Sequence, residues 1–405
     1  MQSDRYRRAA VLAAAVALPA LVMSPLAQAD DGGPVSLPPL RLRMAADDAC
    51  ATASTKTAES RSWKHQALQL SRSWQLSQGA GVTVAVVDTG VGLRSPALSG
   101  RVTAEGRAGE DCVGHGTFAA GLIAGAPLGN GAVTGVAPAA RVLAVRGTDE
   151  RGNASAALVA DGIRSAVDDG AKVVYVGQAL TSGAEELTRA VAYARGKDAL
   201  VVAPAAPDVV PEGPDGKPDT RARKYWPAAV PEVLSVVDYG PAGTRPQGAP
   251  AVLAPDLAAP GDSVVGIGPE GSGHFIGSGS SLAAAHVAGA AALIRSYQPA
   301  LSAADVSRRL LEAAYPDGVP KLDVYAGLTA VLPTRAPAAE AEAAPAHLPP
   351  AASDEPRERS LLLGGVALVV AVLVGAAMVI VPQGKRRGWR PAVRNRPSGA
   401  GAGHV

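Results

Sequence analysis

Ser281 lies in the stretch GSSLAAAHVAG (residues 279–289), which has the features of a nucleophile at the start of a buried helix. Small residues precede its hydroxyl, and the alanine-rich run that follows predicts a closely packed helix. Free backbone N–H groups and the positive end of the helix dipole favour negative charge developing there on an attacked carbonyl. Taken alone, the same stretch also fits a serine that only caps a core helix.

Two upstream stretches carry the side chains that would activate such a hydroxyl. His115 lies between two glycines in CVGHGTFAAGLIAG (residues 112–125), at an expected helix start where space around its ring is clear. Asp88 ends GVTVAVVDTG (residues 81–90), a valine-rich run typical of a strand buried on both faces. Taken singly, Asp88 could cap the following turn, and His115 could be a structural histidine. Together they fit a general base and the acid that orients it.

The middle of the chain alternates strand and helix signals, which predicts an α/β fold with a parallel sheet and helices on both faces. Further strands are expected at 141–146, 172–176, 199–203, 233–237 and 264–267, and helices at 155–169, 185–195 and 303–313. Asp88 would then lie at the carboxyl end of a strand, where open α/β sheets place their chemistry. Residues 208–224 form a loop whose acids could bind calcium, although their spacing matches no known calcium loop.

The N-terminal residues predict export. Three arginines precede an apolar run at 9–22, and Ala-Gln-Ala at 27–29 fits a signal-peptidase site, so residues 1–29 are expected to be a signal peptide cleaved before Asp30. An uncleaved anchor is the alternative, and the short run with Pro19 inside it favours cleavage. Residues 30–62, rich in Pro, Ala, Ser and Asp, are expected to form an irregular extension.

The C-terminal residues predict a membrane anchor. Residues 331–360 are a Pro/Ala-rich linker that cannot bury a core. Residues 361–381 carry no charge and are long enough to span a bilayer, the alternative being a buried core helix. The tail, 382–405, is basic, so by the positive-inside rule it is cytoplasmic and the main domain is extracytoplasmic, in a single-pass protein of the cell membrane.

Composition narrows the function classes. Hydrophobic residues make up 47% of the 405 residues, which is enough for a large core. The central part of the chain has no basic patch with interleaved aromatic residues, which argues against nucleic-acid binding. The 2 cysteines, Cys50 and Cys112, cannot form a cysteine-ligand zinc site. In an exported chain they indicate one disulfide, with two free thiols as the alternative.

The stretches DTG, GHGT and GSSLAAAHVAG, in this chain order, resemble the subtilisin-like serine proteases. The run WQLSQGAGVTVAVVDTGV followed by SGRV, the segment DLAAPGDSVVGI, the cysteine before the histidine, the linker and the anchor are similar to mycosins, the membrane-anchored proteases of type VII secretion in actinobacteria. The resemblance implies a subtilisin-like three-layer sandwich over 63–330 and an extension that wraps it. It also implies a protein or peptide substrate and association with a type VII secretion complex.

The resemblance also assigns roles. Ser281 would attack a peptide carbonyl, His115 would take its proton and later protonate the leaving amine, and Asp88 would hold the imidazole in the useful tautomer. The backbone N–H of Ser281 would supply one oxyanion donor. Neither a cofactor nor a metal is implied.

One departure from the family affects the oxyanion hole. The asparagine that normally supplies the second donor aligns on Pro207, which has no side-chain donor, and losing such a donor costs about 10²–10³ in rate. The strand that backs the site also departs over 175–179, where Gln178 is a candidate replacement donor. Two hypotheses follow: a working serine endopeptidase, and a weakly active or inactive relative that serves as a structural component of a secretion complex.

Overall fold

Seven parallel strands form the central sheet, because their nearly continuous Val, Ala and Leu runs can be buried on both faces. The strand order is β2-β3-β1-β4-β5-β6-β7. The strands are β1 Thr83–Asp88, β2 Val102–Ala104, β3 Arg141–Arg146, β4 Val173–Val176, β5 Leu200–Pro204, β6 Leu234–Tyr239 and β7 Leu257–Pro260. The computed structural model describes residues 36–129, 131–213, 216–332 and 355–388. The predicted signal peptide, most of the predicted linker and the tail beyond 388 lie outside these ranges.

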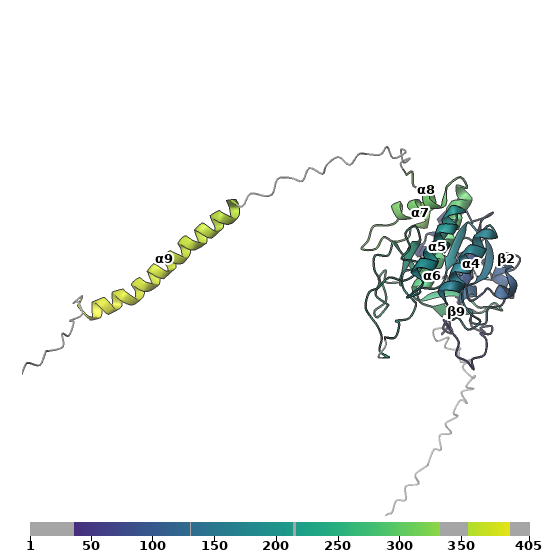
Figure 1. Cartoon of the computed structure of the whole chain (residues 1–405), viewed down its shortest axis with the longest axis horizontal. Coiled ribbons are helices and arrows are strands. Elements are labelled where there is room, and N and C mark those ends of the chain that lie inside the picture. The colour runs from purple at the N-terminus through teal and green to yellow at the C-terminus, as the bar shows by residue number, and fades with distance from the viewer. Residues whose placement is uncertain (1–35, 130, 214–215, 333–354, 389–405) are drawn as a thin grey trace, which may run out of the picture. The chain divides into compact units, whose positions relative to one another are not determined.

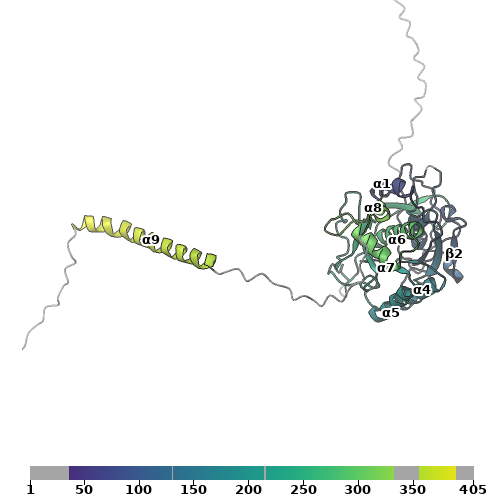
Figure 2. The ribbon, with the colours of Figure 1, turned by 90° about the horizontal axis from the view of Figure 1, so that it is seen from above.

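Helices cover both faces of this sheet, which confirms the expected three-layer sandwich. Alternate side chains of β1 enter two separate cores: Val84 and Val86 on one face, Ala85 and Val87 on the other. The first core packs against α3 His115–Ala124 and α6 Ser280–Tyr297. The second packs against α4 Ala156–Asp168 and α5 Ala184–Gly196, which lie side by side in Figure 2.

The remaining elements lie around this sandwich. Val264–Ile267 is a strand as expected, β8, but it pairs antiparallel with β9 His274–Gly277 in a separate hairpin. Residues 63–76 carry apolar side chains at helical spacing but form two short helices, because the chain turns at Gln69, whose φ of 49° is left-handed. The other short elements are α1 Trp63–Ala67, α2 Leu70–Ser73, η1 Pro96–Leu98, η2 Gly106–Gly109, α7 Ala303–Glu312 and α8 Val324–Thr329.

The extension before α1 runs along the hairpin and the loop before α3. The Leu40 N–H donates to the Ile276 carbonyl at 2.7 Å, and the His274 N–H donates to the Lys56 carbonyl at 2.7 Å. A disulfide joins Cys50 to Cys112. The extension is therefore fastened both to the hairpin and to the chain three residues before His115.

The chain divides into two compact units, Met1–Pro333 and Thr334–Val405. The predicted peptidase domain, 63–330, lies within the first. In the second, Figure 1 shows α9 Glu355–Arg386 as one long helix in yellow. Its segment Arg359–Arg386, whose most apolar stretch of 18 residues has a mean hydropathy of 2.7, is the one helix among the described residues that is long and apolar enough to cross a membrane.

Candidate active site

Three elements bring Asp88, His115 and Ser281 together. Asp88 is the last residue of β1, His115 is the first residue of α3, and Ser281 is the second residue of α6. Since α3 and α6 pack against each other on one face of the sheet, their N-terminal ends meet at the carboxyl edge of β1. All three side chains are buried, none exposing more than 2% of its surface.

The distances allow hydrogen bonds to connect the three side chains in a row. His115 Nδ1 lies 2.9 Å from Asp88 Oδ1 and 2.9 Å from Oδ2. His115 Nε2 lies 3.0 Å from Ser281 Oγ. The imidazole is thus within hydrogen-bond reach of a carboxylate on one side and a hydroxyl on the other.

A second carboxylate, Asp208, also contacts this group. Its Oδ1 accepts the Ser281 N–H at 2.9 Å, and its Oδ2 accepts the Ser281 hydroxyl at 2.5 Å. The same Oδ2 lies 3.4 Å from His115 Nε2. From the sequence, Asp208 was expected only at the start of a loop that could bind calcium, whereas the structure places it against the candidate nucleophile.

The two residues considered for the oxyanion wall are Pro207 and Gln178. Among the residues that the structure describes, no hydrogen bond joins Pro207 or Gln178 to Ser281. Pro207 is the residue before Asp208, so the turn that was expected to lack a donor instead delivers a carboxylate. Elsewhere in this loop, Asp219 pairs with Arg221 and Arg223, and the described residues contain no cluster of His, Cys, Asp or Glu that could hold a metal ion.

Burial and charge act on His115 in opposite directions. Burial alone would lower the pKa of His115, but the negative charges and hydrogen bonds of Asp88 and Asp208 outweigh it and raise the pKa well above its usual range. The site thus favours a protonated ring when both carboxylates are ionised.

A buried tyrosine lies behind the same group. Tyr175 on β4 exposes none of its surface, and its hydroxyl has no hydrogen-bond partner among the described residues. Burial, followed by the charges of Asp88 and Asp208, raises the pKa of Tyr175 well above its usual range. Its hydroxyl therefore keeps its proton.

The turn that presents His115 is held by Asp111, which the sequence analysis did not single out. Asp111 accepts hydrogen bonds from the N–H groups of Gly114 and Thr117 at 2.8 Å, and from the hydroxyls of Thr89 and Thr117 at 2.8 and 2.6 Å. Four donors on one buried carboxylate tie the turn after Asp88 to the start of α3. Burial raises the pKa of Asp111, and these hydrogen bonds oppose that shift.

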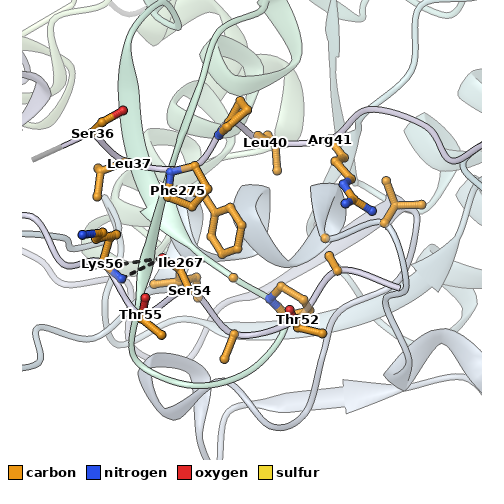
Figure 3. A pocket seen from close by; sticks show the side chains of 18 residues that line it. Ser36, Leu37, Leu40, Arg41, Thr52, Ser54, Thr55, Lys56, Ile267 and Phe275 are labelled. Atoms are coloured by element: carbon orange, nitrogen blue, oxygen red, sulfur yellow. Dashed lines mark hydrogen bonds between the residues drawn. The ribbon is translucent and has the colours of Figure 1, made fainter. Parts of the chain in front are cut away.

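A pocket of about 640 Å³ opens beside this turn, between the extension and the hairpin. Gly114 and Val113 form part of its wall, next to His115. Figure 3 shows the Phe275 side chain between the two stretches of the extension that line the pocket, 36–41 and 51–56. The extension therefore shapes the surface next to the candidate site.

The family profile of the subtilases (peptidase S8) matches residues 79–342. Mycosin-3 of Mycobacterium tuberculosis (strain ATCC 25618 / H37Rv) is 32% identical over 387 residues, covering 79% of this chain and 83% of that protein.

Solved structures point to the same family. The structure of the MycP3 protease from the type VII (ESX-3) secretion system matches with a TM-score of 0.60 and 31% identity, covering 73% of this chain and 96% of that chain. A chain in the structure of an intact ESX-5 inner membrane complex matches with a TM-score of 0.61 and 25% identity, over 87% of this chain and 97% of that one. Because these matches cover most of the chain and its central sheet is parallel, this chain belongs to the subtilase family and, within it, to the mycosins.

Proposed function

We propose that this protein is a serine endopeptidase in which Ser281 is the nucleophile, His115 the general base and Asp88 the group that orients the base. The observation that carries the proposal is the position of His115, whose two ring nitrogens lie 2.9 Å from Asp88 and 3.0 Å from Ser281. A structural histidine would need only one such partner.

In this mechanism, Ser281 Oγ forms a bond to the carbonyl carbon of a peptide while its proton passes to His115 Nε2. The carbonyl electron pair moves onto oxygen, where the Ser281 N–H at the start of α6 stabilises it. Collapse expels the amine, which takes the proton from His115, and water then releases the acyl group by the same steps. Asp88 keeps Nδ1 protonated and stabilises the imidazolium throughout.

The proposed location is outside the cytoplasmic membrane, with α9 as a single-pass anchor. Support comes from the apolar length of α9 and from the basic residues after it, which favour a cytoplasmic tail. The disulfide between Cys50 and Cys112 fits an oxidising compartment. Because related chains come from type VII secretion systems, we propose association with such a complex as well.

The test is covalent labelling of the intact, detergent-solubilised protein with a fluorophosphonate, followed by peptide mapping. Label is expected on Ser281 and should be lost in Ser281→Ala. The matched control is Ser280→Ala, because Ser280 is the neighbouring buried serine but its hydroxyl donates to Asp238 at 2.7 Å. Label that persists in Ser281→Ala, or that is absent from folded protein at every pH and from every variant, would refute the proposal.

A second candidate function is a structural component of the secretion complex with weak or no hydrolysis. The contact of Asp208 with Ser281 favours it, because a carboxylate stands where the oxyanion would be stabilised. The test is complementation of a deletion strain with Ser281→Ala. Normal secretion at normal protein level supports the structural role, and lost secretion at normal protein level refutes it.

A further inference from the structure

Asp208 occupies the position from which an oxyanion would be stabilised. Its side chain, 8% exposed, accepts both the N–H and the hydroxyl of Ser281. The N–H is the backbone donor that the attacked carbonyl oxygen needs, and the hydroxyl is the nucleophile itself. A single carboxylate therefore engages both groups that must act on the substrate.

The backbone immediately before α6 leaves room for this carboxyl group. A Cβ on Gly279 would lie 2.1 Å from Asp208 Cγ and 2.1 Å from Oδ1, so any larger residue there would displace Asp208. The contact thus depends on a glycine two residues before Ser281, in addition to the loop that carries Asp208.

We propose that Asp208 is the second oxyanion-hole residue and that it stabilises the oxyanion only as a neutral carboxylic acid. The inference rests on the proposed function, since it concerns the same attack by Ser281. As an acid, Asp208 releases the Ser281 N–H to the incoming oxyanion, donates its own O–H to that oxyanion and keeps that proton through the reaction. As a carboxylate, it repels the oxyanion and occupies its donor.

The groups that face Asp208 from the neighbouring elements determine where its proton goes. They are His115 from α3, Tyr175 from β4 and, beyond the imidazole, Asp88 from β1. Tyr175 stays neutral. Among the residues that the structure describes, no Lys or Arg side chain forms an ion pair with Asp208, so His115 is its charged partner.

Asp208 and His115 are close enough to share one proton, because Asp208 Oδ2 lies 3.4 Å from His115 Nε2. With the proton on His115, the ring is an imidazolium between two carboxylates, and the Ser281 hydroxyl lies within hydrogen-bond distance of both His115 Nε2 and Asp208 Oδ2. With the proton on Asp208, the ring is free to act as a base and the oxyanion hole has two donors. Only this second form reacts, and both forms carry the same net charge.

The pH dependence of the activity follows from these protonation states. When the pair loses its last proton, Asp208 is ionised and the oxyanion hole is blocked, so activity falls as the pH rises. The pKa of His115 lies well above its usual range, after burial is outweighed by Asp88 and Asp208, which sets this loss on the alkaline side. When the pair gains a second proton, His115 can no longer act as a base, so the profile is bell-shaped.

Asp208→Asn tests this inference, because an amide donates at every pH and cannot ionise. We expect fluorophosphonate labelling and peptide hydrolysis near pH 7.5 to be about 10²- to 10³-fold faster than in the unmodified protein. The alkaline loss should disappear, and activity should instead fall only on the acid side, as His115 is protonated. Asp208→Ala removes the charge without supplying a donor, so its rate should lie between those of the unmodified protein and Asp208→Asn.

The matched control is Glu212→Gln, which removes a negative charge from an exposed position of the same loop and should leave rate and pH profile unchanged. An independent readout is the NMR titration of His115, whose pKa should fall in Asp208→Asn whether or not substrate is present. Thermal unfolding confirms that each variant is folded.

The outcomes separate this inference from the proposed function. A folded Asp208→Asn variant with the rate, pH profile and His115 titration of the unmodified protein overturns the role of Asp208 and leaves the triad standing. If neither protein nor any variant labels Ser281 at any pH, the proposed function fails, and the role of Asp208 with it. Faster labelling in Asp208→Asn, together with loss of the alkaline fall in activity, supports both.

Discussion

Gly177 lies so close to Asp88 that a Cβ on Gly177 would come within 1.8 Å of Asp88 Oδ2. Gly116 approaches the same residue from α3, where a Cβ would lie 3.1 Å from the Asp88 Cβ. Two glycines from different elements thus define the space in which the Asp88 carboxylate meets His115. A methyl group on Gly177 would move that carboxylate directly, whereas one on Gly116 would first meet the Gly90 carbonyl oxygen, 2.1 Å away.

Gly177→Ala is expected to slow hydrolysis about 10²-fold, because a displacement of about 1 Å at a catalytic group has this effect. The measurement is kcat/KM on a peptide substrate, with folding checked by thermal unfolding. Gly196→Ala is the matched control, since its Cβ would meet no atom within 4 Å. Equal rates for the two variants would show that Asp88 does not require its observed position.

Reduction of the disulfide is expected to loosen the extension. Cys50 and Cys112 are 62 residues apart, so the bond stabilises the folded chain by about 4 kcal/mol in the loop-entropy account. Dithiothreitol should make trypsin cleave faster after Lys56 and Arg61, as followed by mass spectrometry. The double variant Cys50→Ser/Cys112→Ser should show the same fast cleavage without reductant. Cleavage rates that do not respond to reduction would contradict the prediction.

Asp111→Asn is expected to lower the free energy of unfolding by at least about 2 kcal/mol. Its amide would turn an NH₂ group toward donors that now share a carboxylate, leaving buried N–H or O–H groups unsatisfied. Urea denaturation measures the loss. Glu110→Gln is the control, because Glu110 is the adjacent acid and forms only an exposed pair with Arg107. Similar losses in both variants would rule out a special role for Asp111.

Local sequence patterns predicted most of the fold. The strand at 141–146 and the hairpin strand at 264–267 have the expected bounds, because valine runs between turn residues leave few alternatives. The separate pairing of β8 with β9 was not expected, since nothing in a four-residue apolar run specifies its partner. The division of the first helical stretch at Gln69 likewise depends on a backbone conformation that no spacing signals.

The site was predictable where function imposes a local pattern, as in the glycines around His115 and the small residues before Ser281. The contact of Asp208 with Ser281 was not, because it comes from a loop that folds back onto α6 and is offset by one residue from the aligned Pro207. Asp111 was missed for a related reason: its four donors come from positions 89, 114 and 117, which only the folded turn brings together.

Lys64 gives a prediction about stability that is independent of catalysis. Its side chain is 1% exposed, its Nζ donates to the Thr134 carbonyl at 2.8 Å, and burial lowers its pKa from 10.5 to about 7. Between these two values the unfolded chain binds more protons than the folded one, so the free energy of unfolding should rise with pH. For one full proton the slope approaches about 1.4 kcal/mol per pH unit.

Lys64→Met should remove this slope between pH 7 and 10, as measured by urea denaturation in a Ser281→Ala background that prevents self-digestion. Lys224→Met is the matched control, because Lys224 is exposed and should leave the slope in place. The difference between the two variants isolates the proton taken up by Lys64 from all other titrating groups. If both variants keep the slope of the unmodified protein, Lys64 is charged in the folded state throughout this range, and the single hydrogen bond to Thr134 is enough to hold a buried ammonium group.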